Sequence, residues 1–79
     1  MGLGKCKKCE KKAVTAIDAG ETPLCGKHYV AQADEECLKS SLLNDISCYG
    51  KIKEHKDIQL EIKKQRPKLY EQLEGYFEV

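Results

Sequence analysis

Apolar residues recur along the chain with two different spacings, which predict strands near the N-terminus and helices after it. Residues 13–17, Ala-Val-Thr-Ala-Ile, are apolar or β-branched, and the Asp18-Ala19-Gly20 run that follows has the composition of a turn. Thr22-Pro23-Leu24 then returns the chain. We therefore predict a short β-hairpin whose two sides are residues 13–17 and 22–24.

From Gly26 onward the spacing changes to steps of three and four residues. The residues that recur in this way are Ala31, Glu35, Leu38, Leu42 and Ile46. This spacing predicts one amphipathic helix from about Lys27 to Asp45, with Gly50 as its stop. Cys37 falls on the face shared with Val30 and Ala33, which predicts a buried thiol that behaves as a small apolar side chain.

The pattern of residues 51–65 fits two structures. Residues 57–62, Asp-Ile-Gln-Leu-Glu-Ile, alternate as a strand does, yet Ile52, His55, Gln59 and Ile62 also fit one face of a helix. Lys, Glu and Gln dominate the segment, so a helix is favoured over a strand. Pro67 suits the first position of a further short helix, and Gly75 weakens the end of that helix.

The length and composition indicate one small domain that needs more than an apolar core. The chain has 79 residues, no Trp, one Phe and five Cys. A core this small is marginal, and such folds usually rely on disulfides, a metal or a partner. An odd number of cysteines argues against a closed disulfide framework. No signal peptide or membrane-spanning run is evident, so we expect an intracellular, cytoplasmic protein with reduced thiols.

The cysteines form a pattern typical of a metal site. Cys6-x2-Cys9 is followed, after fifteen residues, by Cys25-x2-His28. Two cysteines separated by two residues can bind one ion from a tight turn, and residues three apart at a helix start share one face. Three thiolates and an imidazole occupy all four coordination positions of a tetrahedral zinc ion. We predict one structural Zn2+ per chain, bound by Cys6, Cys9, Cys25 and His28.

Three further potential ligands do not fit this site. Cys37, Cys48 and His55 are separated by spacings that match no common metal motif, so a second site stays an open alternative. An Fe–S cluster fits the four ligands less well, because such clusters usually take four cysteines.

The net charge is only +1, but the charges are segregated along the chain. Residues 5–12 contain five Lys and one Glu, a local charge of +4, and residues 51–68 contain seven Lys or Arg and three acidic residues, again +4. These segments suggest an alternative function, RNA or DNA binding, through the basic residues of 51–68 and the lysines of the first segment: Lys5, Lys7, Lys8, Lys11 and Lys12. Near-zero net charge and the absence of an aromatic and basic stacking platform argue against it.

Residues 6–29 resemble the N-terminal zinc finger of tRNA 2-thiolation enzymes of the ATP-pyrophosphatase class. The matching residues are Cys6, Cys9, Ala13, Leu24, Cys25, His28 and Tyr29. The catalytic loop of that family is absent, so the resemblance implies only an RNA-contacting or docking role. The ligand spacing is also similar to that of Gin, a small anti-sigma factor, in which a cysteine stands where this chain has His28. B-box fingers share the general pattern but bind two zinc ions.

Together these features predict a small α+β zinc-stapled domain. Within a single domain, 1–79, we expect a treble-clef-like finger with its long helix at 5–46 and a C-terminal helical extension at 51–79. No nucleophile and base pair is left for catalysis, so the chain is predicted not to be an enzyme. The favoured function is docking of a protein partner, in transcription or its regulation. The predicted docking residues are the apolar face of the last helix: Leu69, Tyr70, Leu73, Tyr76 and Phe77.

Overall fold

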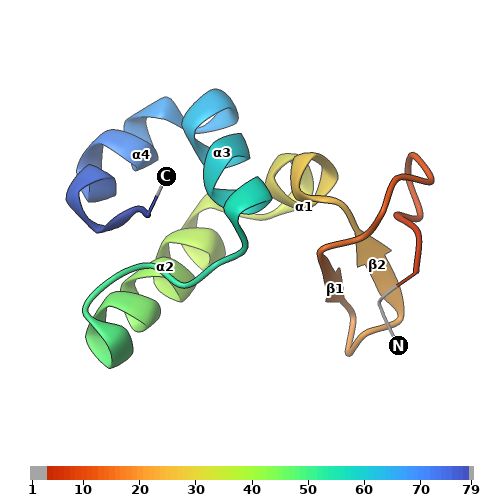
Figure 1. Cartoon of the computed structure of the whole chain (residues 1–79), viewed down its shortest axis with the longest axis horizontal. Coiled ribbons are helices and arrows are strands. Elements are labelled where there is room, and N and C mark those ends of the chain that lie inside the picture. Colours follow the sequence, from red (N-terminus) through yellow and green to blue (C-terminus); the bar gives the residue numbers. More distant parts are fainter. Residues whose placement is uncertain (1–3, 79) are drawn as a thin grey trace.

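The computed structural model describes residues 4–78, which form a small α+β fold. A two-stranded antiparallel hairpin is followed by four α-helices and one 3₁₀ turn. The elements are β1 (Thr15–Ile17), β2 (Thr22–Leu24), α1 (Gly26–Gln32), α2 (Glu35–Tyr49), α3 (Lys56–Gln65), α4 (Pro67–Leu73) and η1 (Glu74–Tyr76). Figure 1 shows the hairpin and the N-terminal loop at one end, the helices α2, α3 and α4 at the other, and α1 between them.

The predicted hairpin is confirmed. Thr15 pairs with Leu24 and Ile17 pairs with Thr22. The connection needs three successive residues with positive φ, namely Asp18, Ala19 and Gly20. Asp tolerates this left-handed conformation better than most residues and Gly adopts it freely, which is why the Asp-Ala-Gly run marks the turn.

The predicted single helix from about Lys27 to Asp45 is wrong, because the chain leaves the helical conformation at Ala33 and Asp34. Both residues have extended backbone, with ψ of 138° and 135°. The Arg66 guanidinium explains the break, since it donates hydrogen bonds to the carbonyls of Val30 (3.1 Å) and Ala33 (2.8 Å). The C-terminal carbonyls of α1 are thus satisfied by a side chain rather than by a further helical turn. Asp34 then becomes the first residue before α2, with Glu35 and Glu36 in its first turn.

The later boundaries follow the sequence signals. Gly50 ends α2 in the left-handed conformation, and its N–H donates to the Ile46 carbonyl at 2.8 Å. The segment 56–65 is a helix and not a strand, while residues 51–55 connect it to α2. Pro67 occupies the first turn of α4, where its missing N–H costs no hydrogen bond.

The main apolar core lies among the helices. Its buried members come from every helix and from the loop before α3: Val30, Leu38, Leu42, Ile52, Ile58, Ile62, Leu69 and Leu73. Gln59 is the one fully buried polar side chain among residues 4–78, and both ends of its amide are satisfied. It donates to the Glu54 carbonyl (2.6 Å) and accepts from the Glu78 N–H (2.9 Å), which attaches the C-terminal segment to α3.

A second, smaller core lies under the hairpin and consists of Cys6, Leu24 and Cys25. Tyr29 packs against both cores, so α1 is the joint between the two ends of the molecule. Gly26 lets α1 lie close to α3, because a Cβ there would come within 2.9 Å of the Asp57 carbonyl carbon. The Gln65 amide also donates to the Lys27 carbonyl at 3.0 Å, which fastens the far end of α3 to α1.

Within residues 4–78, none of the helices has the length and apolar composition needed to cross a membrane.

Candidate metal centre

The first two cysteines lie in a compact turn that we call the knuckle, residues 5–12. A backbone bridge between Lys5 and Lys12 closes it, and the Glu10 N–H donates to the Cys6 carbonyl at 2.9 Å. Glu10 has a φ of 61°, which reverses the chain after Cys9. The Lys7 N–H donates to the Pro23 carbonyl at 2.9 Å. The knuckle is therefore attached to β2, directly before the second pair of ligands.

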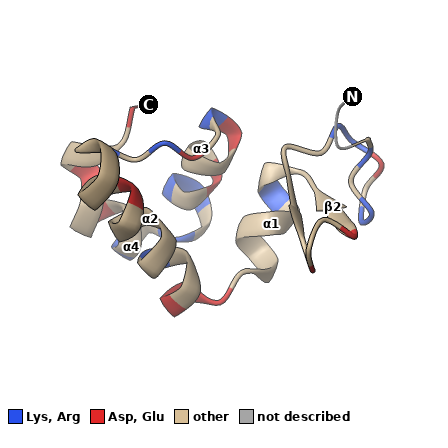
Figure 2. Ribbon diagram, turned by 90° about the horizontal axis from the view of Figure 1, so that it is seen from below, with Lys and Arg blue, Asp and Glu red and all other residues tan. Residues whose placement is uncertain are grey.

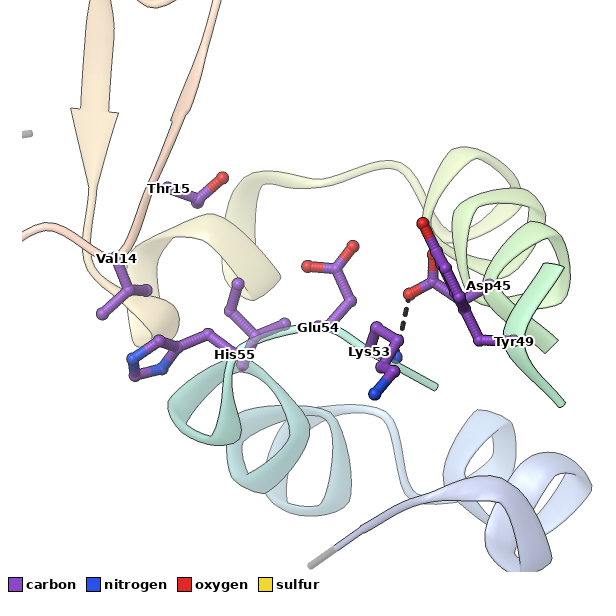
Figure 3. Close-up of a pocket in the computed structure, with 8 residues that line it drawn as sticks. Val14, Thr15, Asp45, Tyr49, Lys53, Glu54 and His55 are labelled. Carbon is purple, nitrogen blue, oxygen red and sulfur yellow. Dashed lines mark hydrogen bonds between the residues drawn. The ribbon is translucent and has the colours of Figure 1, made fainter. Parts of the chain in front are cut away.

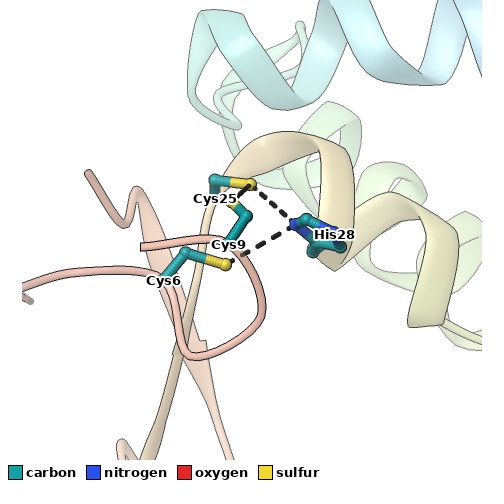
Figure 4. A group of neighbouring side chains, drawn as sticks. All are labelled: Cys6, Cys9, Cys25 and His28. Carbon is teal, nitrogen blue, oxygen red and sulfur yellow. Dashed lines mark hydrogen bonds between the residues drawn. The ribbon is translucent and has the colours of Figure 1, made fainter. Parts of the chain in front are cut away.

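The second pair comes from the start of α1. Cys25 is the residue before the helix, and the Tyr29 N–H donates to its carbonyl at 2.9 Å. His28 lies three residues later in the first turn, so its ring and the Cys25 sulfur lie on the same side of the helix. The hairpin register brings this side toward the knuckle (Figure 4).

The four donor atoms converge on one point, as the sequence predicted. They all lie within 4.8 Å of one another, with Cys6 and Cys25 buried and Cys9 and His28 partly buried. The sulfurs of Cys9 and Cys25 are 3.6 Å apart, and His28 Nδ1 lies 3.6 Å from the Cys6 sulfur and 3.2 Å from the Cys25 sulfur. A tetrahedral zinc ion with Zn–S bonds of about 2.3 Å separates its sulfur ligands by about 3.8 Å. The separations observed therefore suit a single small ion, and these four residues could hold one.

The local electrostatics favour a thiolate at Cys6. Burial is the largest single influence on the pKa of this thiol and raises it. Hydrogen bonds from the backbone of Cys25, Lys8 and Cys9 together outweigh burial and lower the pKa from 9.0 to about 6. One of these is the Lys8 N–H, 3.4 Å from the sulfur. Because metals bind the thiolate and not the thiol, the backbone of Cys25 together with that of the knuckle prepares Cys6 as a ligand.

The pKa of Cys9 moves in the opposite direction. The Lys11 backbone lowers it, but burial and the neighbouring thiols of Cys25 and Cys6 outweigh this and raise it. Three sulfurs this close repel one another once ionised, and a bound cation relieves that repulsion. Ionisation of all three cysteines without a bound cation is therefore unfavourable.

The remaining candidate ligands do not form a second cluster among residues 4–78. Cys37 and Cys48 are both exposed on α2, so the prediction that the Cys37 thiol is buried is wrong. The short length of α1 is the reason, because the break at Asp34 takes Cys37 off the face that carries Val30. His55 precedes α3, where its Nδ1 accepts a hydrogen bond from the Asp57 N–H at 3.1 Å.

The predicted docking face is mostly interior. Leu69 and Leu73 are buried in the main core, so they cannot contact a partner in this fold, and that part of the prediction is corrected. Tyr70 and Phe77 are partly buried and stack on each other with ring centroids 4.6 Å apart. Only Tyr76 remains largely accessible, with 44% of its surface exposed. A domain this small needed most of the face to close its core.

The predicted nucleic-acid residues are all exposed: Lys5, Lys7, Lys8, Lys11 and Lys12. Three of them line two different recesses. Lys8 lines a shallow recess beside His28, whereas Lys11 and Lys12 line a groove against α3. The groove also contains Lys27 and Lys64, which the sequence analysis did not single out individually.

A recess of about 480 Å³ lies between β1, the end of α2 and the loop before α3 (Figure 3). It contains ionisable groups, but several already have structural roles. Asp45 accepts a hydrogen bond from the Lys53 N–H (3.0 Å), and Glu54 accepts one from Ser41 (3.3 Å). Burial is the main reason that the pKa of Glu54 is raised, and the charge of Asp45 raises it further.

Comparisons with family models, with curated proteins and with solved structures find no match to this chain. The resemblances to the thiolation-enzyme finger, Gin and B-box fingers therefore stay predictions.

Proposed function

We propose that the chain is a non-catalytic binding module in which one zinc ion fastens the knuckle to α1. The observation that carries this proposal is the convergence of Cys6, Cys9, Cys25 and His28 within 4.8 Å. Three thiolates and one imidazole are a donor set that zinc prefers over the harder Mg2+ and Ca2+. The order of knuckle, hairpin and helix supports a treble-clef-like finger.

The donor count supports a structural role. Four protein ligands complete a tetrahedral zinc ion, whereas catalytic zinc keeps one position for water or substrate. The pairs of ligands come from two segments that are otherwise joined by few interactions, chiefly the Lys7–Pro23 hydrogen bond and the small core around Leu24. When bound, zinc supplies the cross-link that this end of the chain otherwise lacks.

Native mass spectrometry tests the zinc proposal. The chain purified with zinc should carry one ion, which a strong chelator removes, and Cys6→Ser should abolish that increment. Cys48→Ser is the matched control, because it removes an exposed thiol of α2 and should retain full occupancy. Substitution of cobalt should give the intense visible absorption of a tetrahedral thiolate site. A chain that carries no metal, or a Cys6→Ser variant with full occupancy, would refute the proposal.

We further propose that a protein partner docks at the C-terminal segment around Tyr76. Only part of the predicted docking face supports this proposal. That part is the exposed Tyr76 ring beside the stacked pair of Tyr70 and Phe77. Aromatic side chains are common anchors of interfaces. The carbonyl of Tyr76 accepts a hydrogen bond from the Ile52 N–H at 2.9 Å, which holds the backbone of this residue in place.

Affinity capture with matched variants tests the docking proposal. A partner should be retained by the parent chain and lost with Tyr76→Ala, at a cost on the order of 2 kcal/mol in binding free energy. Tyr49→Ala is the control, because Tyr49 is an even more exposed tyrosine, at 62%, on α2. Equal loss with both variants, or retention with both, would exclude Tyr76 as the anchor.

A further inference from the structure

A groove of about 380 Å³ runs between the knuckle, α1 and α3. Lysines enter it from each of these three segments: Lys11 and Lys12 from the knuckle, Lys27 from α1, and Lys64 from α3. Figure 2 shows the basic segments on the knuckle, on α1 and on α3. The fold thus collects lysines that are up to 53 positions apart in sequence.

Among the residues that the structure describes, these lysines have no ion-pair partner. Within residues 4–78, the one lysine with a carboxylate oxygen inside 4.0 Å is Lys51, which pairs with Glu78. Lys63 lies over the Tyr70 ring, and Arg66 binds the end of α1. The ammonium groups of the groove have no comparable contact, although the groove is also lined by Asp57 and Glu61. Four cations against two anions leave it with a net charge of about +2.

The groove is held in one shape by contacts that do not involve the lysine side chains. Gly26 and Asp57 both line the groove, and their backbones approach so closely that a Cβ on Gly26 would lie 2.9 Å from the Asp57 carbonyl carbon. The Gln65 amide binds the Lys27 carbonyl at 3.0 Å and the Glu61 carboxylate at 2.9 Å. The backbone positions that carry the lysines of α1 and α3 are therefore fixed relative to each other. A preorganised site binds with a smaller loss of conformational entropy.

We propose that this groove binds the sugar–phosphate backbone of a nucleic acid. Lysines spread over three segments suit a polymer of phosphates better than one isolated anion, as in the charged grooves that follow single strands. Leu60 lines the same groove and is 42% exposed, which offers an apolar surface to a sugar or a base. The inference rests on the proposed zinc site, because the metal fixes the knuckle that supplies Lys11 and Lys12.

The test uses the full zinc-loaded chain and fluorescence anisotropy with a labelled 20-nucleotide oligouridine. Four phosphate contacts predict that log K falls with log[KCl] with a slope of about −2.8 on a single strand. The groove variant, Lys12→Gln, Lys27→Gln and Lys64→Gln together, removes one lysine from each segment. It should bind at least tenfold more weakly at 50 mM KCl and flatten the slope to about −0.7.

The control variant carries Lys39→Gln, Lys53→Gln and Lys68→Gln, which make the same change in net charge outside the groove. It should bind within twofold of the parent with an unchanged slope. Equal losses in the two variants would show a delocalised charge effect and overturn the inference. Displacement of the oligouridine by polyglutamate at matched charge would also overturn it, since the groove would then accept any polyanion.

Zinc content, measured on the same samples, separates this inference from the proposed function. A chain that carries one zinc but does not bind oligouridine refutes the nucleic-acid groove alone. A chain that carries no zinc refutes the proposed function, and with it the fixed knuckle on which the groove depends.

Discussion

The two ends of this molecule are stabilised by different interactions. At the helical end, eight buried apolar residues pack against one another. At the knuckle and hairpin, the buried cluster is one leucine and two cysteines. Apolar burial supplies about 1.5–3 kcal/mol for each large side chain, so a core with one leucine cannot order 25 residues. The helical end can therefore rely on packing, whereas the knuckle and hairpin contain too little buried apolar surface to be ordered by packing alone.

Metal removal should produce the largest difference between the two ends. Structural zinc contributes on the order of 10–16 kcal/mol in small fingers, more than the net stability of many domains. With a chelator, or in Cys25→Ser, we expect the NMR signals of residues 5–25 to collapse to random-coil positions. The signals of α2, α3 and α4 should stay dispersed. A fully dispersed spectrum of the metal-free chain would contradict the comparison.

The second largest effect is expected when a buried side chain of the helical end is shortened. Leu42 is fully buried, so Leu42→Ala should lower the free energy of unfolding by about 2–5 kcal/mol. Its neighbour Leu43 is 45% exposed, and Leu43→Ala should change stability by less than about 0.5 kcal/mol. Urea unfolding of the zinc-loaded proteins, followed by circular dichroism, measures both. Similar midpoints for the two variants would show that α2 packs through another face.

The joint between the ends can be tested at Gly26. A Cβ there would lie 2.9 Å from the carbonyl carbon and 3.0 Å from the carbonyl oxygen of Asp57. Because both are backbone atoms, Gly26→Ala should cost about 1–3 kcal/mol, as overpacking does. Gly75→Ala is the control, since nothing lies within 4 Å of its Cβ position. That variant should be neutral or more stable by up to about 1 kcal/mol. Thermal unfolding of both variants measures this difference in stability.

The smallest effect is expected at Glu54, in the recess between the two ends. Burial and the charge of Asp45 raise its pKa above the ordinary 4.5, so its ionised form disfavours folding. This destabilisation by the ionised Glu54 carboxylate is present at neutral pH and disappears as pH falls through the raised pKa. Glu54→Gln should therefore be more stable than the parent at pH 7, by about 0.5 kcal/mol or less. The difference should shrink toward pH 4.5.

Paired urea titrations of zinc-loaded parent and variant across pH 4.5–7.5 measure this difference, with zinc content checked at each pH. A variant that is less stable than the parent at pH 7 would show that the Ser41–Glu54 hydrogen bond outweighs the burial of the charge.

Local signals in the sequence predicted the parts of the fold that depend on near neighbours. The spacing of Cys6, Cys9, Cys25 and His28 identified the cluster, because turn and helix geometry alone bring each pair together. Gly50 and Pro67 marked helix boundaries through their own backbone preferences. The hairpin followed from its turn residues.

The features that the sequence did not predict depend on distant residues. The break after α1 requires Arg66, which lies more than thirty positions away from the carbonyls it binds. The acidic run Asp34-Glu35-Glu36 was the available signal, since it is a common helix start. The periodicity could not show whether Leu69 and Leu73 are buried or exposed. An amphipathic helix has the same sequence pattern whether its apolar face packs on a core or binds a partner.

The position of α1 makes the affinity of the metal site a property of the whole chain. His28 and Val30 are two residues apart on a helix of seven residues, one among the candidate ligands and the other in the main core. Any change in the helical packing that shifts α1 must alter the free energy of metal binding, and thermodynamic linkage requires the reverse effect to be equal. A zinc titration is therefore also a measurement of how well the opposite end of the molecule is packed.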